Sequence, residues 1–319
     1  MTVSKPANEE PIVSVVMPLL NGGRRFHECL ERVLEQDFPE GFEVVVIDSG
    51  STDGSWERLQ ASSREHSQVR ALRIPQAAFG HGKTRNLGVA ESRGEFVAFL
   101  TQDAVPVDQA WLGEMVGAAR RHPKAAGVFG RHRAWPEHGT LLARGMDAHF
   151  DGFGEVETVF QLDDPERYKS DPAYRQRLHF YSDNNSLLRK SVWEKLPYPD
   201  VTFGEDQLWA KAIIEAGYQK VYNPKAVVFH SHRYGFFESK ARAREEALFY
   251  YNYFGYRLGA PLKPSLVEAW KKTRGDLRLL RELAPEELSL WERLNLLREN
   301  FGLFLGHWSA RRTFPKQIQ

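Results

Sequence analysis

Two short acidic segments contain residue types that could perform group-transfer chemistry. Asp103 follows the apolar run 96–100, and Glu205 with Asp206 comes directly after Gly204. A carboxylate at the end of a strand suits a hard divalent cation, which prefers oxygen ligands and also binds phosphate. Paired carboxylates at the start of a helix suit a general base, and helix capping is the simpler interpretation. If the fold brings these segments together, we expect a metal-assisted group-transfer enzyme.

A cation at Asp103 needs a second protein ligand, because one carboxylate supplies too few ligand atoms. His230 and His232 follow a predicted strand at 220–229, and their spacing of two residues places them on one face. Imidazole nitrogen binds Mn²⁺ better than Mg²⁺. The pattern therefore predicts a divalent metal (Mg²⁺ or Mn²⁺) held by Asp103, His230 and His232. Hydrogen-bonded loop histidines are the alternative.

Asp48 ends another predicted strand and could contact a nucleotide. Its carboxylate could accept a hydrogen bond from the imide N–H of a pyrimidine. The Ser- and Gly-rich turn at 49–54 leaves backbone amides for a ribose or a phosphate. Ser, Asp and Gly are also ordinary turn and cap residues, so a purely structural turn is equally consistent with this pattern.

The segment 79–86 is a second candidate for binding phosphate. Gly80 and Gly82 precede a predicted helix, and the N-terminus of a helix favours anions. Lys83 and Arg85 add cationic partners for a diphosphate. A solvated basic turn is the alternative interpretation.

Composition limits the classes of protein to which the chain can belong. Its 319 residues, 42% of them hydrophobic, suffice for one large domain with an appendage or for two domains. The net charge of +1 is not the strongly basic charge that is typical of nucleic-acid-binding proteins. A mean hydropathy of −0.50 argues against a transmembrane helix. The single cysteine, Cys29, is expected in the core and permits no internal disulfide, which fits a cytoplasmic location.

The first hundred residues alternate between strand and helix patterns, which must position these side chains. Alternation of this kind indicates βαβ units in an α/β fold, with a mostly parallel sheet flanked by helices. Ligands of such sheets bind beyond the carboxyl ends of the strands, where the polar clusters lie. The predicted strands are 12–17, 43–48, 69–74 and 96–100, and the predicted helices are 24–36, 55–65 and 82–92.

The remainder of the chain is less regular and then becomes helical. Residues 125–135 are predicted as a strand that leads into an Arg/His-rich loop, and 147–177 as a partly ordered loop on the acceptor side. A helix is predicted at 205–216 before the strand at 220–229.

The C-terminal residues 236–319 carry 15 Lys and Arg against 10 Asp and Glu, a local charge of +5. From residue 286 onward, leucines and aromatic residues recur at spacings of three and four, which predicts a helix. This helix either packs on the protein or a partner, or lies at an anionic membrane surface. We therefore expect a disordered N-terminus at 1–11, a catalytic domain at 12–235 and a helical region at 236–319.

Taken together, the motifs resemble those of family 2 glycosyltransferases with a GT-A fold. The matching segments, in order, are 44–54, Arg85-Asn86, Thr101-Gln102-Asp103-Ala104 and Gly204-Glu205-Asp206. The pattern Phe-x-His-Gly-x-Thr-Arg-Asn at 79–86 is most similar to bacterial rhamnosyltransferases that build cell-surface polysaccharide. The resemblance covers about residues 12–234.

The resemblance implies an inverting transfer of L-rhamnose from dTDP-rhamnose to a hydroxyl of a glycan acceptor. It implies Asp206 as the base, with Glu205 in reserve, and a metal at Asp103 assisted by His230 or His232. Asn184 and Asn185 match a segment that lines the acceptor side. The implied contacts to the nucleotide sugar are Asp48, Arg85, Asn86, Gln102 and Asp103.

One departure from the family pattern concerns the metal. The usual Asp-x-Asp is reduced here, since Gln102 and Ala104 flank Asp103, so a weakly held metal or one that arrives with the nucleotide sugar is expected. The basic C-terminal region fits an enzyme that is peripheral on the inner face of a membrane and uses a polyprenyl-linked acceptor. The same chemistry with a UDP-hexose, and a non-catalytic scaffold that binds nucleotide sugars, are the alternatives.

Overall fold

The computed structural model describes residues 11–315 and divides the chain into two compact units. The first unit comprises the residues up to Arg133 together with Ala148–His230. The second comprises Ala134–Asp147 together with the residues from Ser231 onward. All but the last residue of the predicted disordered N-terminus at 1–11 lies outside the described residues.

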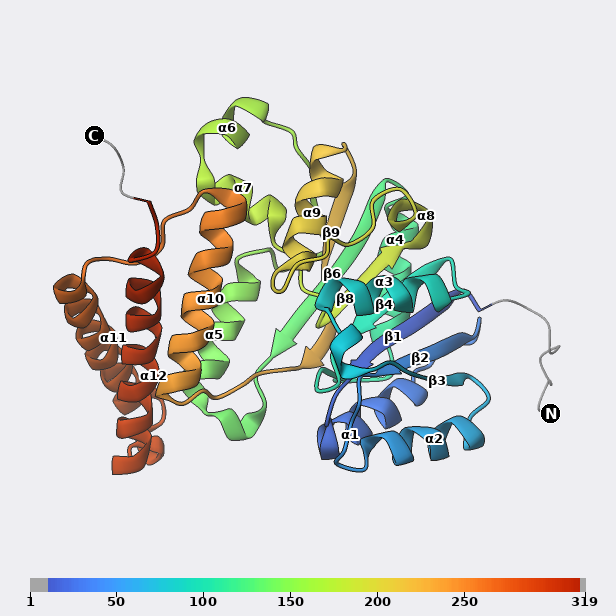
Figure 1. The fold of residues 1–319 in the computed structure, drawn as a ribbon, viewed down its shortest axis with the longest axis horizontal. Coiled ribbons are helices and arrows are strands. Elements are labelled where there is room, and N and C mark those ends of the chain that lie inside the picture. Colours follow the sequence, from blue (N-terminus) through green and yellow to red (C-terminus); the bar gives the residue numbers. More distant parts are fainter. Residues whose placement is uncertain (1–10, 316–319) are drawn as a thin grey trace. The chain divides into compact units, whose positions relative to one another are not determined.

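A nine-stranded mixed sheet forms the centre of the first unit (Figure 1). The strand order is β3-β2-β1-β4-β8-β6-β9-β5, and β7 pairs with β9. Neighbours from β3 to β4 run parallel, as does the pair β6 and β9, whereas β8, β5 and β7 pair antiparallel with their neighbours. The strands are β1 (Val13–Leu19), β2 (Phe42–Asp48), β3 (Val69–Arg73), β4 (Phe96–Leu100), β5 (Val105–Pro106), β6 (Ala125–Arg133), β7 (Thr158–Phe160), β8 (Asn185–Arg189) and β9 (Gln219–Phe229).

The predicted α/β fold is confirmed, and the parallel pairs from β3 to β4 are those that strand–helix alternation predicts. Helices cover this sheet, and α3 lies against β1 and β2. Gly88 of α3 makes that approach possible, because a Cβ atom there would lie 2.3 Å from Val16 Cγ1 of β1. The helices of the first unit are α1 (Gly23–Leu34), α2 (Ser55–Glu65), α3 (His81–Glu91), α4 (Trp111–Arg121), α6 (Pro165–Ser170), α7 (Pro172–His179), α8 (Lys190–Trp193) and α9 (Glu205–Glu215).

The prediction of a partly ordered loop at 147–177 is wrong. This region contains the end of α5 (Thr140–Asp151), then β7, α6 and α7. Asp164 and Asp171 cap α6 and α7 by accepting backbone N–H bonds, and a proline follows each of them at the first helical position. Both helices are short, so they show capping residues but no clear apolar periodicity.

The core of the first unit combines apolar strands with a cluster of aromatic side chains. Phe129 of β6 packs edge-on against Phe153, with ring centroids 5.3 Å apart, and also contacts Tyr222 of β9. Cys29 is fully buried, and its thiol donates to the Ala104 carbonyl oxygen at 3.1 Å, which confirms it as a core residue. The core therefore fixes the ends of β4, β6 and β9, where polar residues follow.

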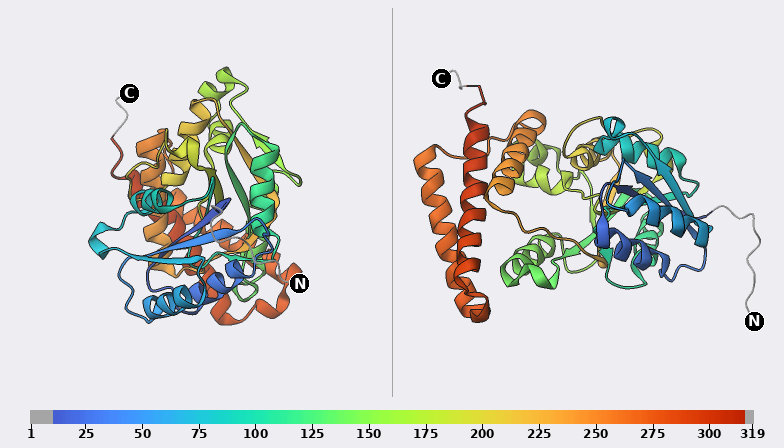
Figure 2. Two further views of the ribbon diagram at one scale, coloured as in Figure 1. Left: turned by 90° about the vertical axis from the view of Figure 1, so that its right-hand side faces the viewer. Right: turned by 60° about the horizontal axis from the view of Figure 1, so that its bottom comes forward.

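Three long helices form most of the second unit: α10 (Phe236–Phe254), α11 (Leu262–Leu283) and α12 (Leu290–Arg311). The helix α12 lies between the other two (Figure 2). Gly302 and Gly306 of α12 let its backbone approach α10 closely, because a Cβ atom at Gly306 would lie 2.5 Å from the Lys240 carbonyl oxygen. The predicted C-terminal helix is thus confirmed and is packed on α10 and α11. Within residues 11–315, we find no helix whose length and apolar character would let it cross a membrane.

Candidate active site

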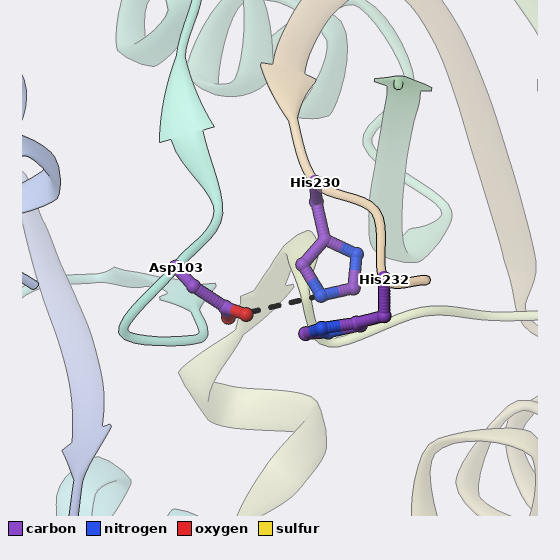
Figure 3. Close-up of side chains that lie close together, drawn as sticks. All are labelled: Asp103, His230 and His232. Carbon is purple, nitrogen blue, oxygen red and sulfur yellow. Dashed lines mark ion pairs between the residues drawn. The ribbon is translucent and has the colours of Figure 1, made fainter. Parts of the chain in front are cut away.

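Asp103 and His230 lie side by side at the ends of strands β4 and β9. The distance from Asp103 Oδ1 to His230 Nε2 is 3.7 Å (Figure 3). His232 follows two residues later in the chain, and potential ligand atoms of the three residues all lie within 4.8 Å of one another. One carboxylate and two imidazoles form a donor set that suits Mn²⁺ better than Mg²⁺. These residues fit the predicted divalent metal.

A buried histidine packs beside this group. The ring of His132 on β6 meets the ring of His230 edge-on, with centroids 5.4 Å apart. Burial, together with the charges of His230 and His149, lowers the pKa of His132 well below its usual value. His132 is therefore neutral at physiological pH and adds no positive charge next to the group of Asp103 and His230.

A second group consists of three carboxylates around one arginine. Gly204 has φ = 72° and precedes α9 in the left-handed region that favours glycine, so Glu205 and Asp206 occupy the first turn. Arg85 of α3 is buried and pairs with Glu205 through Nη1 and with Asp183 Oδ2 at 3.2 Å from Nε. One cation thus faces several carboxylates, which we call the carboxylate cluster (Asp183, Glu205 and Asp206).

Asp183 and Asp206 are connected within this cluster. Asp183 Oδ1 accepts hydrogen bonds from the hydroxyls of Ser186 at 2.7 Å and Tyr198 at 3.0 Å. Asp206 is half-buried, and its Oδ2 accepts the Asp183 backbone N–H at 3.3 Å. The Asp183 side chain is therefore held by hydrogen bonds, whereas Asp206 is the more open of the two carboxylates.

Burial and mutual repulsion dominate the electrostatics of the cluster. Burial raises the pKa of Asp183 to about 6, against the opposing attraction of the Arg85 guanidinium. Burial and the charges of Glu205 and Asp183 raise the pKa of Asp206 well above its usual range. The sequence leaves open whether the helix N-terminus lowers this pKa or like charges raise it. In the structure, burial and the like charges prevail.

Two further residues that were predicted to contact the nucleotide sugar form hydrogen bonds within the protein. The Asn86 amide accepts from Trp193 Nε1 at 2.7 Å and donates to the Tyr198 carbonyl oxygen at 2.9 Å. The Gln102 amide pairs with the backbone of Leu20, accepting its N–H at 2.8 Å and donating to its oxygen at 3.1 Å. Both amides hold backbone segments beside the site, and their contact with a nucleotide sugar stays a prediction, as does that of Arg85.

Asp48 is fully buried at the end of β2 and organises the turn that follows it. Its carboxylate accepts the backbone N–H of Gly50 at 3.1 Å and that of Ser51, and it pairs with Arg73 Nε at 3.1 Å. These bonds give the turn at 49–54 a defined shape. The contact of Asp48 with a pyrimidine base stays a prediction.

The two asparagines predicted for the acceptor side differ in their surroundings. Asn185 is fully buried, and its Nδ2 donates to the carbonyl oxygens of Arg131 and Ala226 at 3.0 and 2.9 Å. Asn184 is half-buried, and its Nδ2 lies 3.5 Å from His230 Nδ1. Asn184 is thus the one placed beside the predicted metal ligands, while Asn185 joins strands in the core.

Neither Asp183 nor Tyr198 is among the residues predicted from the sequence. The signal for Asp183 is weak but present, because it opens the polar run Asp183-Asn184-Asn185-Ser186 just before an apolar strand. The backbone of Asp183 contacts Asp206, and the next residue contacts His230. The structure therefore brings the two acidic segments together through this dipeptide.

Comparison with known proteins identifies the family to which the sequence is similar. The family model described as "Glycosyl transferase family 2" matches residues 14–196, more than half of the chain. The O-antigen chain rhamnosyltransferase RfbN of Salmonella typhimurium is 28% identical over 226 residues, which cover 70% of this chain and 67% of the relative. The O-antigen chain rhamnosyltransferase WbaN of Salmonella anatum is 30% identical over 229 residues, with the same two shares, 70% and 67%.

A solved structure supports the fold over nearly the whole chain. The mannosyltransferase PcManGT from Pyrobaculum calidifontis, in complex with GDP-Man and Mn²⁺, superposes with a TM-score of 0.59. The sequence identity is 17%, and the superposition covers 95% of this chain and 90% of the mannosyltransferase. At this level of identity the likeness establishes the fold, which is that of a GT-A glycosyltransferase.

Proposed function

Because the chain belongs to glycosyl transferase family 2, we propose that it transfers L-rhamnose from dTDP-rhamnose, with inversion, to a hydroxyl of a lipid-linked glycan in cell-surface polysaccharide synthesis. The observation that carries the mechanism is the carboxylate cluster. It holds a half-buried Asp206 whose pKa is raised by burial and by neighbouring negative charge. A base with a raised pKa accepts a proton more readily from an alcohol.

In this mechanism Asp206 takes the proton of the acceptor hydroxyl as its oxygen attacks the anomeric carbon. The new C–O bond forms on the face opposite the diphosphate, the old C–O bond breaks, and dTDP leaves with the bonding electrons. A single displacement inverts the configuration and needs only one base. Glu205 is paired with Arg85, so its proposed role is to hold that arginine and to raise the basicity of Asp206.

A divalent metal would assist the departure of the diphosphate. When bound, a divalent cation neutralises charge that develops on the departing diphosphate. Asp103, His230 and His232 would hold it, since their potential ligand atoms lie within 4.8 Å of one another. With one carboxylate among the three side chains, the protein's own affinity for the metal is expected to be modest, and binding is expected to tighten with the nucleotide sugar.

Support for rhamnose comes from the names of the relatives, two of which are O-antigen chain rhamnosyltransferases. A UDP-hexose is the second candidate donor. It is the alternative because Asp48, the residue proposed to meet the base, would accept the imide N–H of uracil and of thymine alike and so would not distinguish UDP from dTDP. The proposed acceptor is a polyprenyl-linked glycan at the inner face of a membrane.

Nucleotide release from dTDP-rhamnose and from UDP-hexoses tests this proposal. Purified protein is incubated with each donor, Mn²⁺ or Mg²⁺, and a glycan acceptor, and NMR reports the anomeric configuration of the product. We expect turnover with dTDP-rhamnose and an inverted product. Turnover with UDP-sugars alone would exclude rhamnose, and a lack of turnover with every donor would favour the non-catalytic scaffold.

The variant Asp206→Asn tests the base in the same assay. General-base catalysis contributes about 10²–10⁴-fold, so a fall of at least about a hundredfold in kcat is expected. Glu205→Gln keeps the shape of the neighbouring side chain but removes its charge, and it is the matched comparison, with a smaller loss expected. A wild-type rate in Asp206→Asn would remove Asp206 as the base.

A further inference from the structure

The helix α11 has an exposed side on which apolar and basic side chains are interleaved. Residues three or four positions apart lie on the same side of a helix. The side in question, which we call the basic face, comprises Lys263, Leu266, Val267, Trp270, Arg274, Leu277 and Arg281. Trp270 is 53% exposed and Val267 is 50% exposed, which is unusual for large apolar side chains.

A different side of α11 packs within the second unit. Its buried residues are Ser265, Ala269, Thr273 and Leu280, and the helix that it meets is α12. Thr273 and Asp276 accept hydrogen bonds from the Asn300 amide of α12, at 3.3 and 2.8 Å. The packing of α11 on α12 therefore uses a side other than the basic face, on which Leu266, Val267 and Trp270 are exposed.

The charges of α11 are sorted by side. Lys263, Arg274 and Arg281 lie on the basic face. The acidic residues of the helix, Glu268, Asp276 and Glu282, lie on other sides and pair with Lys271, Lys272 and Arg278. A face with cations and no carboxylate attracts an anionic surface and repels a second copy of itself.

We propose that the basic face of α11 is the surface by which this protein binds an anionic lipid bilayer, lying flat in its interface. Trp, Leu and Val would enter the boundary between headgroups and acyl chains while Lys and Arg meet anionic headgroups. A nucleic acid would use the cations but would leave aliphatic side chains in water. The inference deepens the proposed function, because a lipid-linked acceptor resides in a bilayer, and its test is independent of turnover.

The proposal changes the site expected for membrane contact. A membrane surface is one of the two alternatives that the sequence leaves for the helix from residue 286 onward, but Gly302, Gly306 and Ala310 of that helix are buried against α10. The side of α12 that they occupy is therefore not available to a bilayer. Leu290, Trp291 and Leu294 at the start of α12 are exposed as well. On α11, however, Lys263, Arg274 and Arg281 accompany the exposed apolar side chains along the whole length of the helix.

Flotation with vesicles tests the proposal on the full-length chain. We expect binding to phosphatidylcholine vesicles that contain phosphatidylglycerol, weaker binding as salt rises, and little binding to phosphatidylcholine alone. Each cation near an anionic surface contributes about fivefold to partitioning, so Lys263→Glu/Arg274→Glu/Arg281→Glu is expected to lose about a hundredfold or more. Trp270→Ala is expected to bind more weakly without any change in charge.

The matched control is Arg58→Glu/Arg64→Glu/Lys124→Glu, which makes the same change in net charge at exposed positions of the first unit. It is expected to retain most of the binding. Equal losses in the two triple variants, or no binding by the wild type, would overturn the proposal. So would tighter binding to a DNA duplex than to vesicles, or self-association that Trp270→Ala abolishes. Vesicle binding without turnover of any nucleotide sugar would support this inference and count against the proposed function.

Discussion

Replacing Asp183 by asparagine should change how the stability of the protein depends on pH. Burial raises the pKa of Asp183 from an ordinary 3.8 to about 6 in the folded protein. Between these values the folded chain binds more protons at this site than the unfolded chain. The wild-type free energy of unfolding therefore loses this contribution as pH rises from about 4 to about 6, and Asp183→Asn cannot lose it.

The size of the effect follows from the pKa shift. A difference of about 2 pKa units at 1.36 kcal/mol per unit corresponds to about 3 kcal/mol. The variant also alters the hydrogen bonds with Ser186 and Tyr198 and the pairing with Arg85, which adds an offset to its stability. Loss of the Asp183 charge also lowers the pKa of Asp206, which acts in the same direction. The diagnostic quantity is the change in the stability difference between pH 4.5 and pH 7.5. It is expected to be roughly 2 kcal/mol or more in favour of the variant, because pH 4.5 already lies above the unfolded pKa of 3.8.

Urea unfolding, followed by tryptophan fluorescence at several pH values, measures this difference. The total pH dependence of the wild type also includes buried histidines, which act in the opposite direction. Burial lowers the pKa of His179 to about 3, for example. The stability that the neutral His179 contributes is therefore lost as pH falls below the pKa of this group in the unfolded chain. Subtracting the wild-type curve from that of the variant removes such contributions.

Asp37→Asn removes an exposed carboxylate far from Asp183 in the sequence and is the matched control, with a difference that is expected to change little with pH. For Asp183→Asn, the free energy of unfolding relative to wild type is expected to rise with pH. A difference that stays constant, or that falls as pH rises, would refute the conclusion that burial raises the pKa of Asp183.

Three other outcomes follow from the same structure. Arg85→Met leaves buried carboxylates without their cation and should lower the free energy of unfolding by about 3–5 kcal/mol in urea titrations; wild-type stability would contradict this. Gly82→Ala should lower the thermal midpoint, because its Cβ would lie 2.1 Å from the Pro199 carbonyl oxygen. Gly113→Ala, with no atom within 4 Å of its Cβ, is the control and should not. His230→Ala should weaken Mn²⁺ binding, measured by electron paramagnetic resonance, by at least about tenfold, and unchanged affinity would exclude His230 as a ligand.

Local periodicity accounts for what the sequence predicts well. The strands β1, β2 and β4 are short apolar runs ended by polar turns, and the helix α1 between β1 and β2 buries apolar residues at helical spacing. Because each of these patterns spans only a few residues, the neighbouring sequence contains all the information that it needs. The side chains at the ends of those strands are predicted for the same reason.

Long-range partners account for what the sequence leaves out. Arg85 lies about a hundred residues before Asp183 and 120 residues before Glu205, and only folding brings it into contact with them. No local pattern distinguishes an arginine that binds a diphosphate from one that holds two buried carboxylates. The short helices α6 and α7 are also missed from the sequence. The dipeptides Asp164-Pro165 and Asp171-Pro172 mark where they begin, but neither helix has an apolar stripe.

The dipeptide Asp183-Asn184 has a consequence for how the enzyme responds to its ligands. Its backbone N–H contacts Asp206 and its asparagine contacts His230, so one short segment touches both the proposed base and a proposed metal ligand. A ligand that shifts this segment from either side changes the free energy of the other contact. Donor and acceptor affinities should therefore be thermodynamically coupled, by the same factor in both directions.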